Sequence, residues 1–522
     1  MPPGDAQRTL TRREVVATAA AGALALGLPG GGLAGVPRRT RPRPYQAPLP
    51  IPDVLTGANL SIPIREAAVQ VLPGRPTRMW TYGGSFPGPT IRRPSGEATR
   101  VRFAHRLGPR AGELSVHLHG GHNRASEDGQ PGGLTARQPR SLYCDISPGL
   151  SAAESGNDLL IEPGGERTYT YEHIEDGAPE RAAFQWYHDH RLDRSARNIW
   201  RGLAGMWILD DDFDASLPLP RGRRDLPLML CDRSFDRDNQ LIDPFSTGLR
   251  PPDDGIAARH VLVNGAVAPY HGVSPQRYRL RVLNASQFRS YDLRLTRGLR
   301  MVQIASESGL MPRPLERADI LLGPGERAEL IVDFAPARGE RVELVSVPRR
   351  NAPRALGSSA YVGRLMQFRV GTRRAPDRTA IPASLRPLPA WVADAPRSPS
   401  HSWRLSVGGG FRPSWLINGR TFDPAHVEAR VRLGETVTWE IHNRTAVAHL
   451  VHLHHMDWYM LARNGKRPPP WERCLKETFF LDPGDRVVVA GKASDFPGKY
   501  LVHCHMLDHE DHGMMSQFEV VP

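Results

Sequence analysis

Short apolar runs, separated by turns that contain proline and glycine, make up most of the chain. In residues 278–284 and 437–443, apolar side chains alternate with polar ones, a pattern typical of β-strands. The 50 glycines and 49 prolines supply many turns. Because short strands joined by such turns pack as facing sheets, we predict an all-β fold made of β-sandwiches.

A turn motif occurs three times and predicts three consecutive domains. Residues 163–167, 324–327 and 483–486 each combine proline, glycine, an acidic residue and arginine, and each copy lies between apolar runs. Repetition of this kind indicates a repeated structural unit. The domains are predicted at residues 46–212, 226–372 and 403–522, with polar or proline-rich linkers at residues 213–225 and 373–402.

The N-terminal segment has the pattern of an export signal. Arg12 and Arg13 precede an apolar, alanine-rich run over residues 15–28, as in twin-arginine signals. This run is too short to cross a bilayer comfortably as a helix. We expect residues 1–45 to be this signal and a basic tail, cleaved near Ala34. The twin-arginine machinery would then export the protein to the periplasm, the cell surface or the medium. The alternative is a disordered tail that carries arginines.

The net charge of +13 comes from 68 basic and 55 acidic residues. Only four of the basic residues are lysines, and the arginines are scattered among acids rather than clustered. No nucleic-acid-binding motif is present. We therefore expect no nucleic-acid partner. Because the apolar run at residues 15–28 is short, we also expect no stable membrane insertion. The sequence does not indicate an oligomeric state.

The C-terminal residues contain a candidate copper site. Cys504, His509 and Met514 have the spacing of three of the four ligands of a blue (type 1) copper, which takes two histidines, a thiolate and a weak axial methionine. His449 is the natural second histidine. Met515 is adjacent to Met514, but the spacing of ten from Cys504 favours Met514.

Eight further histidines form four His-x-His pairs. A single pair is commonly two solvated or hydrogen-bonded histidines, and zinc, which usually closes a site with four ligands, is a second alternative. Four pairs beside a Cys-His-Met set favour a copper cluster over both. On a strand, residues 503 and 505 face one side and residue 504 faces the other, so one strand would join two metal sites. The pairs are His117 and His119, His188 and His190, His452 and His454, and His503 and His505.

The repeat also indicates where the metals lie. Residues 290–295 in the second copy correspond to residues 449–454 in the third copy, and they contain no metal ligand. We therefore expect the middle domain to be a spacer. The ligands would come from the first and third domains alone, and the cluster would lie where those two domains meet.

Four motifs resemble, in order, the copper-binding motifs of three-domain multicopper oxidases of the laccase type. They are residues 117–120, 186–190, 449–454 and 503–509. Residues 84–89 and 202–205 are most similar to the bacterial spore-coat laccases, bilirubin oxidases and phenoxazinone synthase. One departure is Leu450, where the family usually has proline. The resemblance covers about residues 50–522 and implies three consecutive cupredoxin-like Greek-key β-sandwich domains.

The resemblance further implies four copper ions and a reaction. Phenols or aromatic amines would give single electrons to the type 1 copper through the exposed edge of His509, and O2 would be reduced to water at a three-copper cluster. The type 1 copper would take His449, Cys504, His509 and Met514; the type 2 copper would take His117 and His452; the type 3 pair would take His119, His188, His190, His454, His503 and His505.

Two acids match residues that line the oxygen and proton route in such laccases. Glu510 follows a type 1 ligand, and Asp128 lies nine residues after His119. Both positions suit catalytic proton transfer. The alternatives are a solvated acid for Glu510 and an ordinary polar turn for Asp128.

Three cysteines besides Cys504 are present, Cys144, Cys231 and Cys474, so at most one disulfide can form among them. Buried free thiols are the alternative.

Two other functions fit the same motifs. A Cu(I) or Mn(II) oxidase is an alternative enzyme, although the 12 methionines do not cluster as in cuprous oxidases. A copper-free structural factor on the same fold is another alternative, but such proteins have lost ligand residues and this chain has kept every one.

Overall fold

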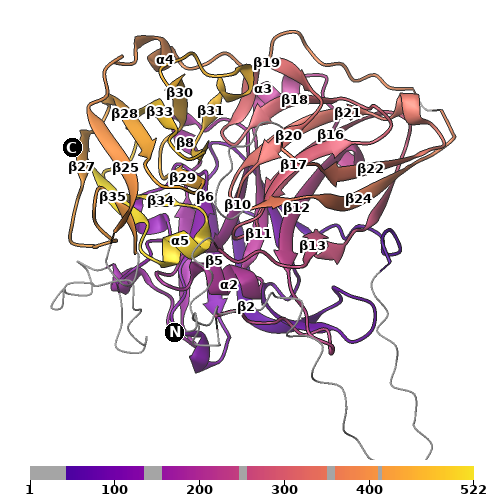
Figure 1. The fold of residues 1–522 in the computed structure, drawn as a ribbon, viewed down its shortest axis with the longest axis horizontal. Helices are drawn as coiled ribbons and strands as arrows, with labels where there is room; N and C mark the ends of the chain where they lie inside the picture. Colours follow the sequence, from indigo (N-terminus) through magenta and orange to yellow (C-terminus); the bar gives the residue numbers. More distant parts are fainter. Residues whose placement is uncertain (1–42, 134–155, 246–254, 350–358, 375, 409–413) are drawn as a thin grey trace, which may run out of the picture. The chain divides into compact units, whose positions relative to one another are not determined.

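Strands are the main elements, and they form three pairs of facing sheets (Figure 1). The computed structural model describes residues 43–133, 156–245, 255–349, 359–374, 376–408 and 414–522. Each pair is built from one stretch of the chain, and one hydrophobic cluster fills the space between its two sheets. The prediction of an all-β chain of β-sandwiches is confirmed. We call the pairs the first, middle and third sandwiches.

The first sandwich packs the sheet β3-β2-β5-β7 against the sheet β1-β4-β11-β10-β6, and β8 and β9 form a small ribbon. Its strands are β1 (Val54–Leu55), β2 (Asn59–Val69), β3 (Thr77–Tyr82), β4 (Gly88–Pro94), β5 (Thr99–His105), β6 (Val116–His119), β7 (Glu166–Tyr171), β8 (Ile174–Glu175), β9 (Ala178–Pro179), β10 (Ala183–Asp189) and β11 (Ala204–Asp210).

The middle sandwich packs the sheet β14-β13-β12-β16-β21-β18-β19 against the sheet β15-β24-β22-β17-β20, and β23 pairs with β17. Its strands are β12 (Asp225–Arg233), β13 (His260–Val263), β14 (Ala266–Val267), β15 (Tyr270–Val273), β16 (Arg277–Asn284), β17 (Ser290–Leu295), β18 (Met301–Ser306), β19 (Gly309–Arg317), β20 (Ile320–Leu322), β21 (Arg327–Asp333), β22 (Arg341–Ser346), β23 (Ala360–Tyr361) and β24 (Gly363–Val370).

The third sandwich packs the sheet β26-β25-β28-β33-β30-β31 against the sheet β27-β35-β34-β29-β32. Its strands are β25 (His401–Gly408), β26 (Ser414–Ile417), β27 (Ala429–Arg432), β28 (Thr436–Asn443), β29 (His449–Leu453), β30 (Trp458–Arg463), β31 (Leu475–Lys476), β32 (Thr478–Leu481), β33 (Arg486–Lys492), β34 (Gly498–Cys504) and β35 (Met515–Val521).

The described α-helices are short: α2 (Ser195–Arg201), α3 (Asp212–Ser216), α4 (Ala390–Asp394) and α5 (Leu507–Asp511). None of the helices in the described ranges is long and apolar enough to cross a membrane. The predicted signal, except for its last three residues, and Cys144 lie outside the described residues. The predicted domain limits remain predictions.

The three sandwiches repeat one topology. A parallel pair followed by an antiparallel partner occurs as β2-β5-β7, β12-β16-β21 and β25-β28-β33. The turn motif precedes the last strand of each set, and its glycines, Gly164, Gly325 and Gly484, have φ angles of 82°, 84° and 81°. This left-handed region favours glycine, which explains why the motif recurs.

The second sheets of the three sandwiches also correspond to one another strand by strand, and the comparison shows which strands carry candidate metal ligands. β6, β17 and β29 occupy one equivalent place, and β10, β22 and β34 occupy another. β17 and β22 contain no histidine, whereas their counterparts carry the His-x-His pairs. In Figure 1, β6 and β10 lie beside β29 and β34, and this is where the first and third sandwiches meet.

Candidate metal centres

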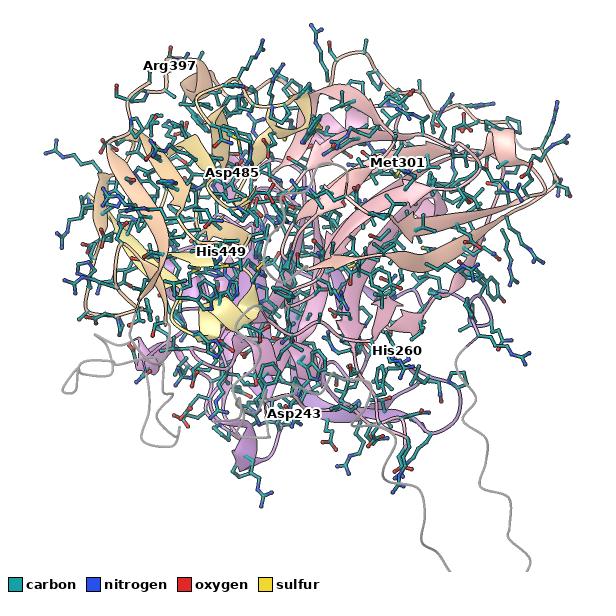
Figure 2. The ribbon with its side chains drawn as sticks, in the orientation of Figure 1. Asp243, His260, Met301, Arg397, His449 and Asp485 are labelled. Carbon is teal, nitrogen blue, oxygen red and sulfur yellow. The ribbon has the colours of Figure 1, made fainter. Side chains whose placement is uncertain are left out.

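Cys504, His449 and His509 lie together in the third sandwich, although they come from three elements. Cys504 ends β34, His449 begins β29, and His509 lies in α5. Cys504 Sγ is 3.5 Å from His449 Nδ1 and 3.6 Å from His509 Nδ1, and the two Nδ1 atoms are 3.1 Å apart. Figure 2 labels His449, which lies near α5. Three potential ligand atoms therefore face a common point.

Burial keeps this set neutral until a cation binds. It raises the pKa of the Cys504 thiol to about 12 and lowers the pKa of His449 to about 3. Thr445 Oγ1 lies 2.8 Å from His449 Nε2, which leaves Nδ1 directed toward Cys504. A thiol this deep needs a bound cation to become a thiolate, and metal ligation deprotonates cysteine.

Met514, rather than Met515, lies with these residues. Cys504 N–H donates a hydrogen bond to Met514 O (3.0 Å), and Met514 N–H donates to His509 O (2.9 Å). The Met514 side chain belongs to the same hydrophobic cluster as Cys504, whereas Met515 packs in a separate cluster with Leu501. The packing and the sequence spacing therefore favour the same methionine.

The eight paired histidines meet between the first and third sandwiches, and all are buried. β6, β10 and the residue after β10 bring one half of them, and β29, β34 and the residue after each of these strands bring the other half. Three sets have ring nitrogens within 4.8 Å of one another: His117, His119 and His188; His117, His452 and His454; His190, His454 and His503. Two of these sets mix residues of both sandwiches, so neither sandwich holds the cluster alone.

Hydrogen bonds leave one nitrogen on several of these rings free for a metal. Backbone carbonyl oxygens lie 2.6, 2.9 and 3.1 Å from the Nδ1 atoms of His117, His188 and His452. The Nε2 atoms of the same three rings are buried without a partner among the described residues. Burial also lowers the pKa of His188 and of His452 well below the ordinary value. Neutral imidazoles held in this way are a donor set that suits copper.

Comparison with known proteins decides the family. Family models described as "Multicopper oxidase" match residues 64–142 and 396–522. A laccase of Bacillus stratosphericus is 30% identical over 496 residues, which cover 85% of this chain and 91% of that protein. The chain belongs to the multicopper oxidase family.

Two further similarities agree with this assignment. A bilirubin oxidase of Albifimbria verrucaria is 30% identical over 514 residues, which cover 91% of this chain and 81% of that protein. The crystal structure of a laccase from Pediococcus acidilactici has a TM-score of 0.76 at 28% identity, over 92% of this chain and 95% of the other. The predicted family, the cupredoxin-type fold, the oxidoreductase class and copper as cofactor are confirmed.

The multicopper oxidase motif departs from its usual proline at Leu450, and the middle sandwich accommodates the change. A Cβ on Gly323 would lie 2.6 Å from Leu450 Cδ1. The leucine side chain therefore occupies space that is open because residue 323 has no side chain. Leu450 O accepts the N–H of His505 at 2.5 Å. The substitution therefore keeps the backbone pairing of two candidate ligand strands.

Asp128 is buried rather than part of a solvated turn, being 1% exposed. Its Oδ2 lies 2.7 Å from His454 Nδ1, and its carbonyl oxygen is the acceptor 2.6 Å from His117 Nδ1. One residue thus orients two histidines that come from different sandwiches. The polar-turn alternative does not describe this position.

Glu510 is also buried, 1% exposed, and faces the cluster rather than solvent. Its Oε2 lies 3.0 Å from His503 Nδ1 and its Oε1 lies 3.9 Å from His190 Nδ1. Burial raises the pKa of Glu510, but the two histidine rings outweigh burial and hold the pKa below its ordinary value. The carboxylate therefore lies beside two rings of the histidine cluster and is held in its ionised form.

The sequence motifs missed two polar residues that contact the cluster. Glu477 O is the carbonyl 3.1 Å from His452 Nδ1, and Thr478 Oγ1 lies 3.3 Å from His119 Nε2. Thr478 begins β32 and Glu477 directly precedes it, in a stretch that has no histidine or cysteine ligand. The pairing of β32 with β29 and contacts with the middle sandwich bring them to the site, and no local pattern signals these contacts.

The expected exposed edge of His509 is wrong. His509 is 1% exposed, because Trp415 covers it with ring centroids 4.3 Å apart and Phe288 lies 6.4 Å away. Trp415 comes from the third sandwich and Phe288 from the middle sandwich. Folding places these two rings over the ligand, and the motif around His509 contains neither.

Cys231, Cys474 and Cys504 are free and buried. Cys231 and Cys474 therefore do not pair with each other, and burial raises the pKa of each to about 11. Cys144 lies outside the described residues, so the prediction about its pairing stays a prediction.

Proposed function

We propose that the chain is a laccase-type oxidase that couples one-electron oxidation of phenols or aromatic amines to four-electron reduction of O2 to water. One observation carries this proposal. Cys504, at the end of β34, faces a type 1 ligand set. Its neighbour His503 belongs to the histidine cluster, and its other neighbour, His505, packs against the rings of His119 and His188 in that cluster. Two candidate copper sites are thus joined by three consecutive residues, which suits the passage of single electrons.

The ligand assignment follows from this arrangement. Four bound copper ions, one held by His449, Cys504, His509 and Met514 and three held by the eight paired histidines, would accept and store the electrons that O2 needs. Asp128 orients His117 and His454 through hydrogen bonds. Glu510, between His190 and His503, holds and passes protons, which O2 reduction consumes.

The aromatic rings that cover His509 indicate which class of electron donor the protein would oxidise. Trp415 and Phe288 are themselves buried, at 7% and 5% exposed, so an electron from an organic donor would reach His509 through aromatic rings rather than at a solvent-exposed imidazole. An electron can leave an aromatic molecule without transfer of an atom. This favours phenols and aromatic amines over a metal ion, which would need charged or polar ligands at the entry point.

Oxygen uptake by the copper-loaded protein tests the function. With a phenolic dye as donor, we expect one O2 consumed for every four donors oxidised, without release of hydrogen peroxide. The same assay with Cu(I) or Mn(II) tests the alternative. Rapid oxidation of either metal ion with no turnover of the dye would contradict the laccase-type function and support a metal-ion oxidase.

We propose further that residues 1–45 direct export by the twin-arginine route. Arg12 and Arg13 precede the apolar run, and a metal site built from two distant domains suits a protein that is exported folded. Replacing both arginines with lysine keeps the charge but removes the receptor-read signal. We expect the double variant to stay inside the cell with its N-terminus uncleaved. Normal secretion would point to the general secretory route.

A further inference from the structure

The middle sandwich, which holds no metal ligand, reaches the cluster through its turn motif. Gly325, at φ 84°, lies so close to His505 that a Cβ there would be 3.0 Å from the imidazole ring. Gly323, in the same turn, packs against Leu450. The two contacts fall on the candidate ligand strands of the third sandwich, so the middle sandwich is more than the spacer predicted from sequence.

Arg327 follows this turn and links all three sandwiches. It is 1% exposed. Its Nε donates to Phe184 O on β10 at 2.8 Å, and its Nη1 donates to the Glu477 carboxylate beside β32. Its guanidinium also occupies the space beside Gly120, where any Cβ would meet Nη2. Gly120 directly follows His119, so the arginine packs against the residue next to a candidate ligand.

Glu477, the partner of Arg327, contacts two candidate ligands from different sandwiches. Its carbonyl oxygen lies 3.1 Å from His452 Nδ1, and its Oε1 lies 3.4 Å from His119 Nε2. The His119 and His452 rings are stacked, with centroids 3.8 Å apart and planes 9° apart. One glutamate therefore sets the orientation of a stacked pair in which each ring belongs to a different sandwich.

Further residues of the middle sandwich hold Glu477 in place. Ser308 Oγ donates to its Oε2 at 3.0 Å, and Glu307 Oε2 accepts the N–H groups of Glu477 and Thr478 at 3.0 and 2.8 Å. Lys476 Nζ donates to Glu307 Oε1 at 2.7 Å. Both the side chain and the backbone of Glu477 are thus fixed from the ligand-free sandwich.

We infer that Arg327 and Glu477 are positioning residues, through which the ligand-free middle sandwich orients His119 and His452 for the three-copper cluster. This rests on the ligand assignment of the proposed function. A planar guanidinium that stays charged can hold a buried carboxylate in one orientation. Without it, the buried Glu477 carboxylate loses its cationic partner beside two candidate metal-binding rings and keeps the hydrogen bond from Ser308 to Oε2, so Oε1, the oxygen beside His119, is less firmly held.

The test replaces Arg327 and, as a matched control, Arg281. Arg281 is equally buried in the middle sandwich and pairs with Asp225 and Glu329, but no contact joins it to a candidate ligand in the described residues. Wild type, Arg327→Met and Arg281→Met are loaded with copper and dialysed. Copper per chain, the type 2 signal in electron paramagnetic resonance and the blue absorption are then measured.

We expect Arg327→Met to lose the type 2 signal and about one copper per chain while it keeps the blue absorption. Contacts that orient metal-bound histidines change metal affinity by about 10–100-fold. Arg281→Met should keep both signals. A complete type 2 signal in Arg327→Met would overturn the inference, and so would an equal loss in Arg281→Met, because that loss would come from general destabilisation.

If Arg327→Met does not fold, Glu477→Gln tests whether the Glu477 carboxylate positions His119 and His452. This change keeps the backbone carbonyl and the shape of the side chain but removes the carboxylate. Loss of the type 2 signal with the blue absorption intact supports the inference, and an unchanged signal overturns it. The wild type separates the two claims: if it lacks a type 2 signal, the proposed function fails, whatever the variants show.

Discussion

Cys504 is the residue at which two candidate sites meet. Its thiol is buried and has a pKa of about 12, so only a bound cation would make it a thiolate at neutral pH. Its two neighbours point to the other side of the strand and into the histidine cluster. The assignment therefore predicts that the two sites can be damaged separately.

Cys504→Ser and His452→Ala test this separation. Cys504→Ser should abolish the blue absorption, because a hydroxyl is too hard a ligand to replace the thiolate. His452→Ala should abolish O2 reduction and leave the blue absorption, because His452 belongs to the cluster. Absorption spectra and oxygen uptake of both variants check the prediction. If His452→Ala were colourless with its fold intact, the partition of ligands between the sites would be wrong.

Glu510→Gln tests the role of the buried acid between His190 and His503. The amide keeps the shape of the side chain and cannot exchange a proton as a carboxylate does. We expect O2 turnover to fall by about 10²–10⁴-fold, with little change in the anaerobic reduction of the blue copper. Stopped-flow measurement of both half-reactions checks this. Equal slowing of the two would instead indicate damage to the neighbouring His509.

At the scale of elements, the strand β16 shows how alternation can mislead. Tyr278, Leu280 and Val282 face the middle core, as the pattern predicts. Arg279 and Arg281, on the opposite face, are buried as well, 2% and 1% exposed. They pair with Asp214, Asp225 and Glu329, which come from α3, β12 and β21.

The Asp225–Arg281 pair gives the middle sandwich a pH-dependent stability. Burial alone would raise the pKa of Asp225, but Arg281 and Arg279 outweigh it and hold the pKa at about 2. Because this folded-state pKa is below the unfolded value, the ionised form stabilises the fold by about 2 kcal/mol. That contribution is complete above about pH 4 and is lost as the pH falls toward 2.

Asp225→Asn should therefore unfold more easily than wild type at pH 7, by about 2 kcal/mol, and the difference should shrink below about pH 4. Denaturant unfolding of both proteins across this pH range measures it. Asp333→Asn, at the end of β21 where the carboxylate is 41% exposed, is the control, with an expected change of about 0.5 kcal/mol or less. A difference that stayed constant down to pH 2 would contradict the account.

For the whole molecule, the sequence predicted what local patterns encode. Strand alternation and repeated turns gave the β-sandwiches, and the turn motif marks the same place in each of them. The His-x-His pairs and Cys504 gave the residues that the structure brings together. These predictions succeeded because the spacing of residues along a strand fixes which side chains share a face.

Contacts between sandwiches could not be predicted from local sequence patterns. Trp415 covers His509, and Arg327 reaches Glu477, only because separate parts of the chain fold against one another. Neither contact has a local pattern, so the edge of His509 was expected to be exposed and the middle domain to be a spacer. The first expectation is wrong. The middle sandwich has no histidine on β17 and β22, as expected of a spacer, but it contacts candidate ligands, because burial and long-range pairing are properties of the folded chain.

Copper content and electron paramagnetic resonance of the protein, produced with copper and dialysed, test the central claim most directly. The account predicts four copper ions per chain: one gives the blue type 1 signal, one gives a type 2 signal, and two are silent because they are paired. Zinc alone, or a single copper with no type 2 signal in a folded protein, would contradict the assignment of the eight paired histidines to a three-copper cluster.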